Sequence, residues 1–415
     1  MDNLLAKINP TAAERAAFSA TTASFLQTIN SKLKKATAIL GGSGAKDTWL
    51  AGNYDVDIFV VFDLQKFADK DISAVLGKIL RTTFPKIKIV TLHGSRDYFQ
   101  LQYHHLKVEV IPILKITKAE QAKNITDISP LHSVWVNKHT PKLKKEIRLA
   151  KQFLRAQHLY GAESYIMGLS GYVVEILIAY YGSFSNFLKS AVKWNEKEII
   201  DVEQHYRGKD VLFELNQSKI QSPLIVIDPV DKSRNAAAAF SLEKFLQLKK
   251  IARAYLHHPA PEFFIPQRVD LDLLRAEAQR KKIDLVYLSL TPLSGKEDVI
   301  GVKLLNVYHY LQEQLAVFSI VKAGWEWDGG KTASFYFFLA KKELPREALH
   351  AGPPLHLQAF VADFKKKHKH SFIQEGKIMA RITVDYPQLA DFVKHLLTEK
   401  YLLEKIKSVK TVNIW

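Results

Sequence analysis

Residues 41–62 read GGSGAKDTWLAGNYDVDIFVVF, and this stretch decides how the rest of the chain is interpreted. It begins with a turn rich in glycine and serine. It ends in a run of β-branched and aromatic residues that is typical of a buried strand. Asp55 and Asp57 stand at the start of that run, two positions apart. Residues i and i+2 of a strand point to the same face, so both carboxylates are expected at one place beside the turn.

Two carboxylates that converge next to an apolar strand repel each other unless a cation lies between them. The backbone N–H groups and the hydroxyl of a Gly-Ser turn can bind phosphate, and oxygen ligands beside a phosphate favour Mg²⁺. Glu109, the acidic residue of an otherwise apolar run at 108–112, is expected to add a third carboxylate from a neighbouring strand. Two metals held in this way can activate an attacking hydroxyl and stabilise a leaving pyrophosphate. An exposed strand face with solvated acids is the alternative, and the combination of these features disfavours it.

The composition excludes several classes of protein. The 415 residues include no cysteine, which excludes disulfides, zinc–thiolate sites, iron–sulfur clusters and cysteine nucleophiles and is most simply explained by a cytoplasmic location. The apolar runs are too short to span a bilayer, so no membrane association is expected. Lys and Arg (59) exceed Asp and Glu (42), giving a net charge of +17. This charge suits a polyanionic partner, although a generally basic proteome would also explain it.

Hydrophobic periodicity predicts an α/β region, then a helical region, then a second α/β region. In the first we expect helices at 11–37, 46–50 and 72–83, and strands at 38–40, 56–62, 86–92, 98–103 and 106–114 with a turn at His104-His105. The helical region is expected at 142–158, 172–181, 184–192 and 241–257, with a strand at 224–227. In the last region we expect strands at 284–291, 317–327, 332–340 and 411–415 and a helix at 299–315. Strand–helix–strand–strand is the first part of a ferredoxin-like fold.

The motif Gly42-Ser43-x-Ala45-Lys46-x-Thr48, followed by Gly52 and Asp55-Val56-Asp57, resembles the signature of the nucleotidyltransferase superfamily. The chain more narrowly resembles the archaeal-type, class I CCA-adding enzymes, which are tRNA nucleotidyltransferases. That resemblance rests on further motifs in the same order: Pro130-Leu131-His132, Arg148-Leu149-x-Lys151, Tyr160-Gly161-Ala162-Glu163, Gly168-x-Ser170-Gly171-Tyr172, Glu175-x-Leu177-Ile178 and Asp228-Pro229-Val230-Asp231-x-x-Arg234-Asn235.

The resemblance implies an α/β (α+β) multidomain fold. Its parts are a nucleotidyltransferase head at 1–135, a helical neck at 136–258, a ferredoxin-like body at 259–343 and 401–415, and a small α/β tail that binds tRNA at 344–400. It also implies template-independent addition of C, C and A to the 3′ end of tRNA from CTP and ATP, with Mg²⁺ as cofactor. The oligomeric state is left open, with a homodimer among the options.

By position, Asp55, Asp57 and Glu109 match the family's catalytic and metal-binding carboxylates, although the third is usually aspartate. We expect Ser43 and Lys46 to bind the triphosphate, and the resemblance implies further nucleotide-binding residues. The full set is Gly42, Ser43, Lys46, His132, Lys151, Tyr160 and Arg234. Arg234 is expected to help select CTP and ATP, because its fork of donors suits a base edge.

Structural explanations compete with several of these assignments. Lys46 could be a solvated helix lysine, His132 a structural histidine, and Arg234 an ion-pair partner of Asp228 or Asp231. The cluster between Phe364 and Phe372 suits RNA phosphates, although a solvated loop explains it almost as well. Its lysines are Lys365, Lys366, Lys367 and Lys369. Two other functions remain open: a poly(A) polymerase or another nucleotidyltransferase of the superfamily, and a catalytically inactive RNA-binding protein.

Overall fold

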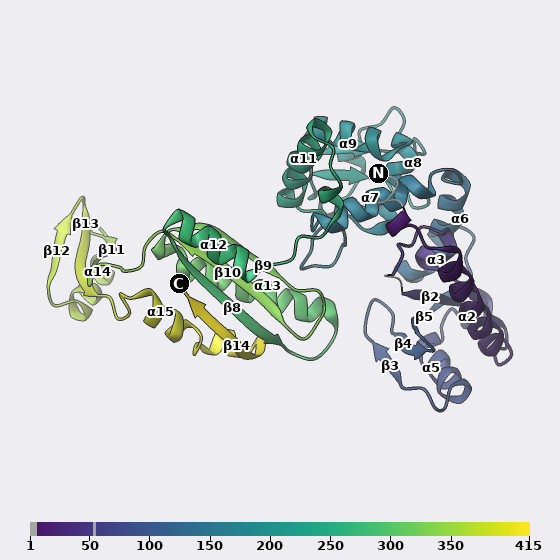
Figure 1. The fold of residues 1–415 in the computed structure, drawn as a ribbon, viewed down its shortest axis with the longest axis horizontal. Coiled ribbons are helices and arrows are strands. Elements are labelled where there is room, and N and C mark those ends of the chain that lie inside the picture. The colour runs from purple at the N-terminus through teal and green to yellow at the C-terminus, as the bar shows by residue number, and fades with distance from the viewer. Residues whose placement is uncertain (1–5, 53–54) are drawn as a thin grey trace. The chain divides into compact units, whose positions relative to one another are not determined.

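The computed structural model describes residues 6–52 and 55–415. The chain divides into two units, Met1–Gln267 and Arg268–Trp415, and each is described by itself (Figure 1).

The first unit begins with a five-stranded mixed sheet in the order β1-β2-β5-β4-β3. Strands β2 and β5 are parallel, and the other neighbouring pairs are antiparallel. The strands are β1 (Ala36–Leu40), β2 (Val56–Phe62), β3 (Ile89–Leu92), β4 (Tyr98–Tyr103) and β5 (Leu106–Leu114). Helices α2 (Ala12–Asn30) and α5 (Ile72–Thr83) pack on the sheet, where Phe25, Ile29, Leu76 and Leu80 join its core. Short helices α3 (Gly42–Lys46) and α4 (Leu64–Phe67) follow β1 and β2.

The predicted strands 56–62, 98–103 and 106–114 and the helix 72–83 are confirmed at their bounds. The helix expected at 11–37 is wrong at its end, because Asn30 hydrogen-bonds both backbone groups of Ala38 and thereby turns the chain into β1. The helix expected at 46–50 is also wrong. Helix α3 occupies the preceding turn, and Asp47, in the left-handed region at φ 50°, ends it.

The rest of the first unit is mainly helical. Its long helices are α6 (Ser129–His139), α7 (Lys144–Ala156), α8 (Gly171–Tyr181), α9 (Phe184–Lys193) and α11 (Leu242–His257), and α10 (Val211–Glu214) is a single turn. Strands β6 (Glu198–Ile200) and β7 (Leu224–Val226) form a small parallel pair. Ser170, Ser183 and Ser241 each cap a helix by accepting a backbone N–H with the side-chain oxygen. The helices share one apolar core, which includes Phe153 and Leu177.

The second unit contains a four-stranded antiparallel sheet in the order β14-β8-β10-β9. Its elements are β8 (Asp284–Pro292), α13 (Glu297–Leu315), β9 (Ile320–Glu326), β10 (Ala333–Leu339), α15 (Leu389–Leu396), α16 (Lys400–Leu403) and β14 (Ile406–Ile414). This chain order and sheet order are those of a ferredoxin-like fold, as predicted. Strand β9 begins later than expected because residues 316–318 form a 3₁₀ turn that ends at Ser319 with φ 61°.

The two faces of this sheet are covered by different helices. Val286, Leu288 and Leu290 share a core with α13 and α15. Leu285, on the opposite face, packs with Leu274 of α12 (Leu271–Lys281), a helix that the sequence did not predict.

Residues 344–387 form a segment that is inserted in the sequence between β10 and α15. It forms a three-stranded sheet in the order β11-β13-β12 with one helix. The elements are β11 (Glu347–Pro354), α14 (Gln358–Lys367), β12 (Ser371–Gln374) and β13 (Lys377–Thr383). Phe364, Ile378 and Ala380 form its small core. The division into four regions bounded near 135, 258, 343 and 400 stays a prediction. Within the described residues, no helix is both long enough and apolar enough to cross a membrane.

Candidate active site

The parallel pairing of β2 and β5 brings two of the predicted carboxylates together. In its register Asp57 lies directly opposite Glu109. Asp55 comes just before β2, and its Oδ2 lies 3.2 Å from Lys107 Nζ. Gln100 Nε2 on β4 donates to Glu109 Oε1 at 2.9 Å, which fixes that carboxylate from the other side.

The glycine turn is fitted closely to Asp57. Gly41 N donates to the Asp57 carbonyl oxygen at 2.7 Å. Gly42 has φ +53°, and a Cβ added there would lie 1.7 Å from Asp57 Oδ2. Position 42 therefore has to be glycine for two reasons, its backbone conformation and the approach of the carboxylate. Gly42 and Ser43 are the first two residues of α3, and Gly41 is its N-terminal cap.

The electrostatics of Asp57 suit a cation. Burial, followed by the nearby charge of Glu109 and that of Asp55, raises the pKa of Asp57 to about 6, although Lys46 and Lys107 act in the opposite direction. A divalent ion between the carboxylates would relieve this repulsion. Among residues 6–52 and 55–415, no three His, Asp or Glu side chains are already gathered as a metal-binding group.

Replacing Asp57 by asparagine should stabilise the metal-free protein above about pH 6. The folded chain binds the Asp57 proton more tightly than the unfolded chain, whose reference pKa is 3.8, so this group's contribution to stability falls as the pH rises from 3.8 to about 6. Urea unfolding of wild type and variant in EDTA, at pH 4 and pH 7, checks this. We expect the variant's relative gain to be larger at pH 7. An equal difference at both pH values would contradict the raised pKa.

Lys46 and Lys151 lie together in a buried group. Lys46 is 8% exposed and Lys151 2% exposed, so the explanation of Lys46 as a solvated lysine is wrong. Tyr160 is held next to them: a Cβ added at Gly171 would lie 2.7 Å from the Tyr160 hydroxyl and 3.5 Å from Lys151 Nζ. Burial, above all, raises the pKa of Tyr160, which keeps the hydroxyl protonated as a donor.

His132 and Arg234 meet at a second carboxylate, that of Asp228, which is fully buried. Asp228 Oδ2 lies 3.1 Å from His132 Nε2 and 2.6 Å from Arg234 Nη1, and Oδ1 accepts from the Tyr172 hydroxyl at 3.0 Å. The His132 and Tyr172 rings stack at 4.0 Å. Burial alone would raise the pKa of Asp228, but His132 and Arg234 outweigh it and hold the value at about 2. The ion pair between Arg234 and Asp228, which was the structural explanation proposed for Arg234, is thus present.

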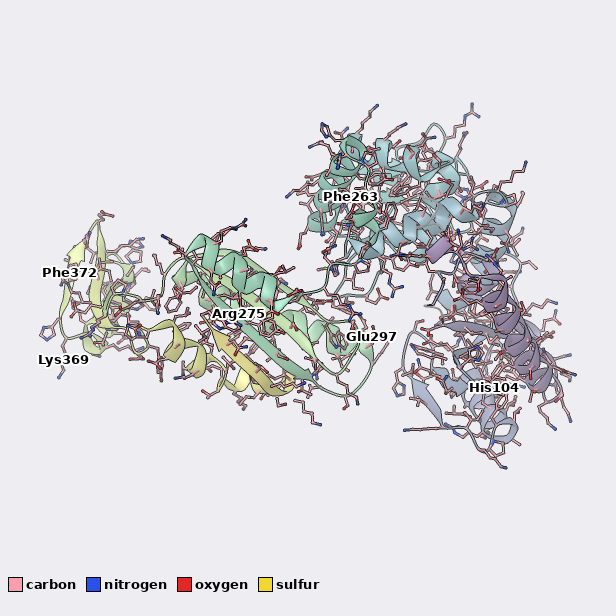
Figure 2. All side chains as sticks on the ribbon, viewed as in Figure 1. His104, Phe263, Arg275, Glu297, Lys369 and Phe372 are labelled. Carbon is pink, nitrogen blue, oxygen red and sulfur yellow. The ribbon has the colours of Figure 1, made fainter. Side chains whose placement is uncertain are left out.

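The predicted lysine cluster lies in the inserted segment. Lys365, Lys366 and Lys367 form the last turn of α14, Lys369 follows in a turn, and all four are exposed. Figure 2 shows Lys369 and Phe372 at the outer edge of this segment. Phe364 is buried, whereas Phe372 is exposed. Cations in the last turn also complement the helix dipole, which is the structural explanation of the cluster.

Two family models match the first unit. One, described as a nucleotidyltransferase domain, covers residues 23–132, and the other, described as tRNA nucleotidyltransferase, second domain, covers residues 145–265. The CCA-adding enzyme of Nanoarchaeum equitans is 35% identical over 337 residues, which are 81% of each chain. The chain belongs to the family of archaeal-type CCA-adding enzymes. The CCA-adding enzyme of Methanosarcina barkeri is 30% identical over 406 residues, 92% of this chain and 86% of that one.

Membership of the archaeal-type CCA-adding enzymes confirms the predicted family and the inference of a nucleotidyltransferase. Proteins of this superfamily generally use divalent metal ions. Among solved structures, the Cid1 poly(U) polymerase bound to MgATP matches with a TM-score of 0.51 and 13% identity, over 64% of this chain and 97% of that one. At that identity the match supports the nucleotidyltransferase-like fold alone.

Proposed function

We propose that this chain adds C, C and A to the 3′ end of tRNA in the cytoplasm, using CTP, ATP and Mg²⁺. The observation that carries the proposal is the pairing of Asp57 with Glu109 beside the Gly42 turn, in a chain whose relatives are named CCA-adding enzymes. The net charge of +17 fits a polyanionic substrate.

Asp57 and Glu109, joined by Asp55, would hold Mg²⁺. The ion would supply activation of the 3′-hydroxyl and neutralisation of the leaving pyrophosphate. Ser43 and Lys46 orient the triphosphate next to these carboxylates. The 3′-oxygen forms a bond to the α-phosphorus, the bond from that phosphorus to pyrophosphate breaks, and Glu109 accepts the hydroxyl proton.

Purified protein, Mg²⁺ and tRNA that lacks its 3′ CCA test the proposal when each nucleoside triphosphate is supplied singly. We expect CTP alone to add two residues, and ATP to add one residue only after both C residues are present. Long extension with ATP alone would favour a poly(A) polymerase and overturn the proposal. Failure of all four triphosphates to support addition would overturn it as well.

Arg234→Ala should reduce the preference for CTP over UTP about ten- to a hundredfold, the loss expected for one charge-assisted hydrogen bond. The Arg234 side chain is 33% exposed while its partner Asp228 is fully buried, so the guanidinium can hold Asp228 and still face a base. Ratios of kcat/KM for CTP and UTP measure the effect. Arg207→Ala, which removes an exposed arginine of the same unit, is the control. An unchanged ratio in Arg234→Ala would make the ion pair with Asp228 its whole role.

A further inference from the structure

A fully buried carboxylate joins the two lysines of the proposed triphosphate site. Glu175 on α8 is 0% exposed. Its Oε2 lies 2.6 Å from Lys46 Nζ, and its Oε1 lies 2.8 Å from Lys151 Nζ. Thr48 Oγ1 donates to the same Oε1 at 2.6 Å. Glu175 therefore connects α3, which follows the glycine turn, with α7 and α8 of the helical part.

The two ammonium groups are engaged to different extents. Lys151 Nζ donates to Glu175 Oε1 and to both oxygen atoms of Thr48. An ammonium group has three N–H donors, so each donor of Lys151 has an acceptor. Within the described residues, Lys46 Nζ has one such oxygen partner, which is Glu175. Of these two lysines, Lys46 is the one whose charge acts on Asp57, together with Lys107 from β5. Lys46 thus keeps donors for a ligand beside the catalytic carboxylates, whereas Lys151 is committed to Thr48 and Glu175.

The charge state of Glu175 follows from this arrangement. Burial by itself raises the pKa of Glu175, but Lys151 and Lys46, by charge and by hydrogen bonds, outweigh burial and lower the value to about 2. The carboxylate is therefore ionised at neutral pH. It offsets one of the two buried positive charges and fixes where the Lys46 ammonium lies.

We propose that Glu175 is a positioning residue for nucleotide binding, which holds the Lys46 ammonium in place for the triphosphate while Lys151 and Thr48 hold the Glu175 carboxylate. This inference rests on the proposed function and assigns Glu175 a role within the same site. It predicts an effect shared by CTP and ATP, because both carry the same triphosphate, and no effect on the choice between them.

Glu175→Gln keeps the size of the side chain and removes its charge. We expect KM for CTP and for ATP to rise together by about ten- to a hundredfold, as for the loss of a charge-assisted contact, with kcat, the CTP-to-ATP preference and the Kd for tRNA little changed. Lys46→Ala should raise KM similarly. The double variant Glu175→Gln/Lys46→Ala should be no worse than the more affected single variant, because both changes remove one interaction.

Asp127→Asn is the matched control. Asp127 is also fully buried and ion-paired, with Arg96. Its replacement should lower Tm without raising KM for nucleotides. If Glu175→Gln behaves like this control, or if its effect multiplies with that of Lys46→Ala, the positioning role is wrong. Should Glu175→Gln fail to fold, Thr48→Val, which removes the hydroxyl that donates to the Glu175 carboxylate, gives a second test: KM for CTP and ATP should rise together, and an unchanged KM would overturn the positioning role.

Direct binding of CTP and ATP separates this inference from the proposed function. If the wild-type protein added no nucleotide to tRNA, the proposed function would fail. A weaker Kd for both nucleotides in Glu175→Gln would then still support the positioning role, and an unchanged Kd would overturn it.

Discussion

Asp57→Ala is expected to reduce nucleotide addition at least about a thousandfold, because losing a metal-binding carboxylate removes several kcal/mol of transition-state stabilisation. Asp57 lies opposite Glu109 and against the Gly42 turn, where a shorter side chain leaves no ligand atom in its place. The affinity for tRNA should stay close to that of the wild type. Single-turnover addition of C to tRNA, together with a filter-binding Kd, measures both quantities.

Asp69→Ala is the control for Asp57→Ala, because it removes an exposed carboxylate from the same part of the chain. It should leave both rate and affinity unchanged. Near wild-type addition by Asp57→Ala at saturating Mg²⁺ would contradict the metal assignment. Equal losses of rate and tRNA affinity would indicate misfolding, which the Tm of the variant would reveal.

Replacing Lys365, Lys366, Lys367 and Lys369 with serine should weaken tRNA binding by up to roughly a thousandfold at 0.1 M salt. Each phosphate contact contributes about 0.9 to the slope of log affinity against log salt, so four lost contacts flatten the slope by about 3.6. All four side chains are exposed and lie apart from the carboxylates along the chain. The turnover rate at saturating tRNA should therefore change little. Binding measured at four salt concentrations and one fixed pH checks both expectations.

A second quadruple variant separates local contacts from net charge. Serine at Lys341, Lys342, Lys407 and Lys410 removes the same charge from exposed positions of the same unit. We expect it to change the salt slope less than the variant of the inserted segment. Equal slopes in the two variants would show that overall charge, rather than this cluster, accounts for binding.

The sequence predicted those elements whose signals are local and complete. Strand β2 is apolar apart from Asp57, and β4 and β5 are joined by a turn at His104, whose φ is 52°. Helix α12 was missed because it buries only Leu274 and Ala278, too few residues for an apolar period. Strand β11 was missed because it is largely exposed and ends in Gly352-Pro353-Pro354, which is typical of a boundary.

The candidate site, like the fold, could be predicted only where the sequence signal is local. Asp57 and Glu109 could be paired from the sequence because each lies in an apolar strand, and adjacent strands follow from the α/β pattern. Glu175 could be recognised only as part of a motif, whereas the ion pair of Asp228 with Arg234, six positions away, could be proposed from the sequence. The other contacts join residues far apart in the chain: Glu175 lies 129 positions from Lys46, and Asp228 lies 96 positions from His132. No local pattern reports contacts over such separations.

The way the inserted segment joins its sheet has a consequence for how such chains can change over evolutionary time. Glu343 and Gln388 form an isolated antiparallel bridge, and the N–H of Leu344 donates to the carbonyl of Pro387 at 2.8 Å. The chain thus departs and returns at neighbouring positions, as at the open end of a hairpin. Residues 344–387 can be lengthened, shortened or exchanged as a cassette while the strands on either side keep their order and register. A lineage could in this way change the exposed surface of this segment, including its lysines, and leave the ferredoxin-like framework as it was.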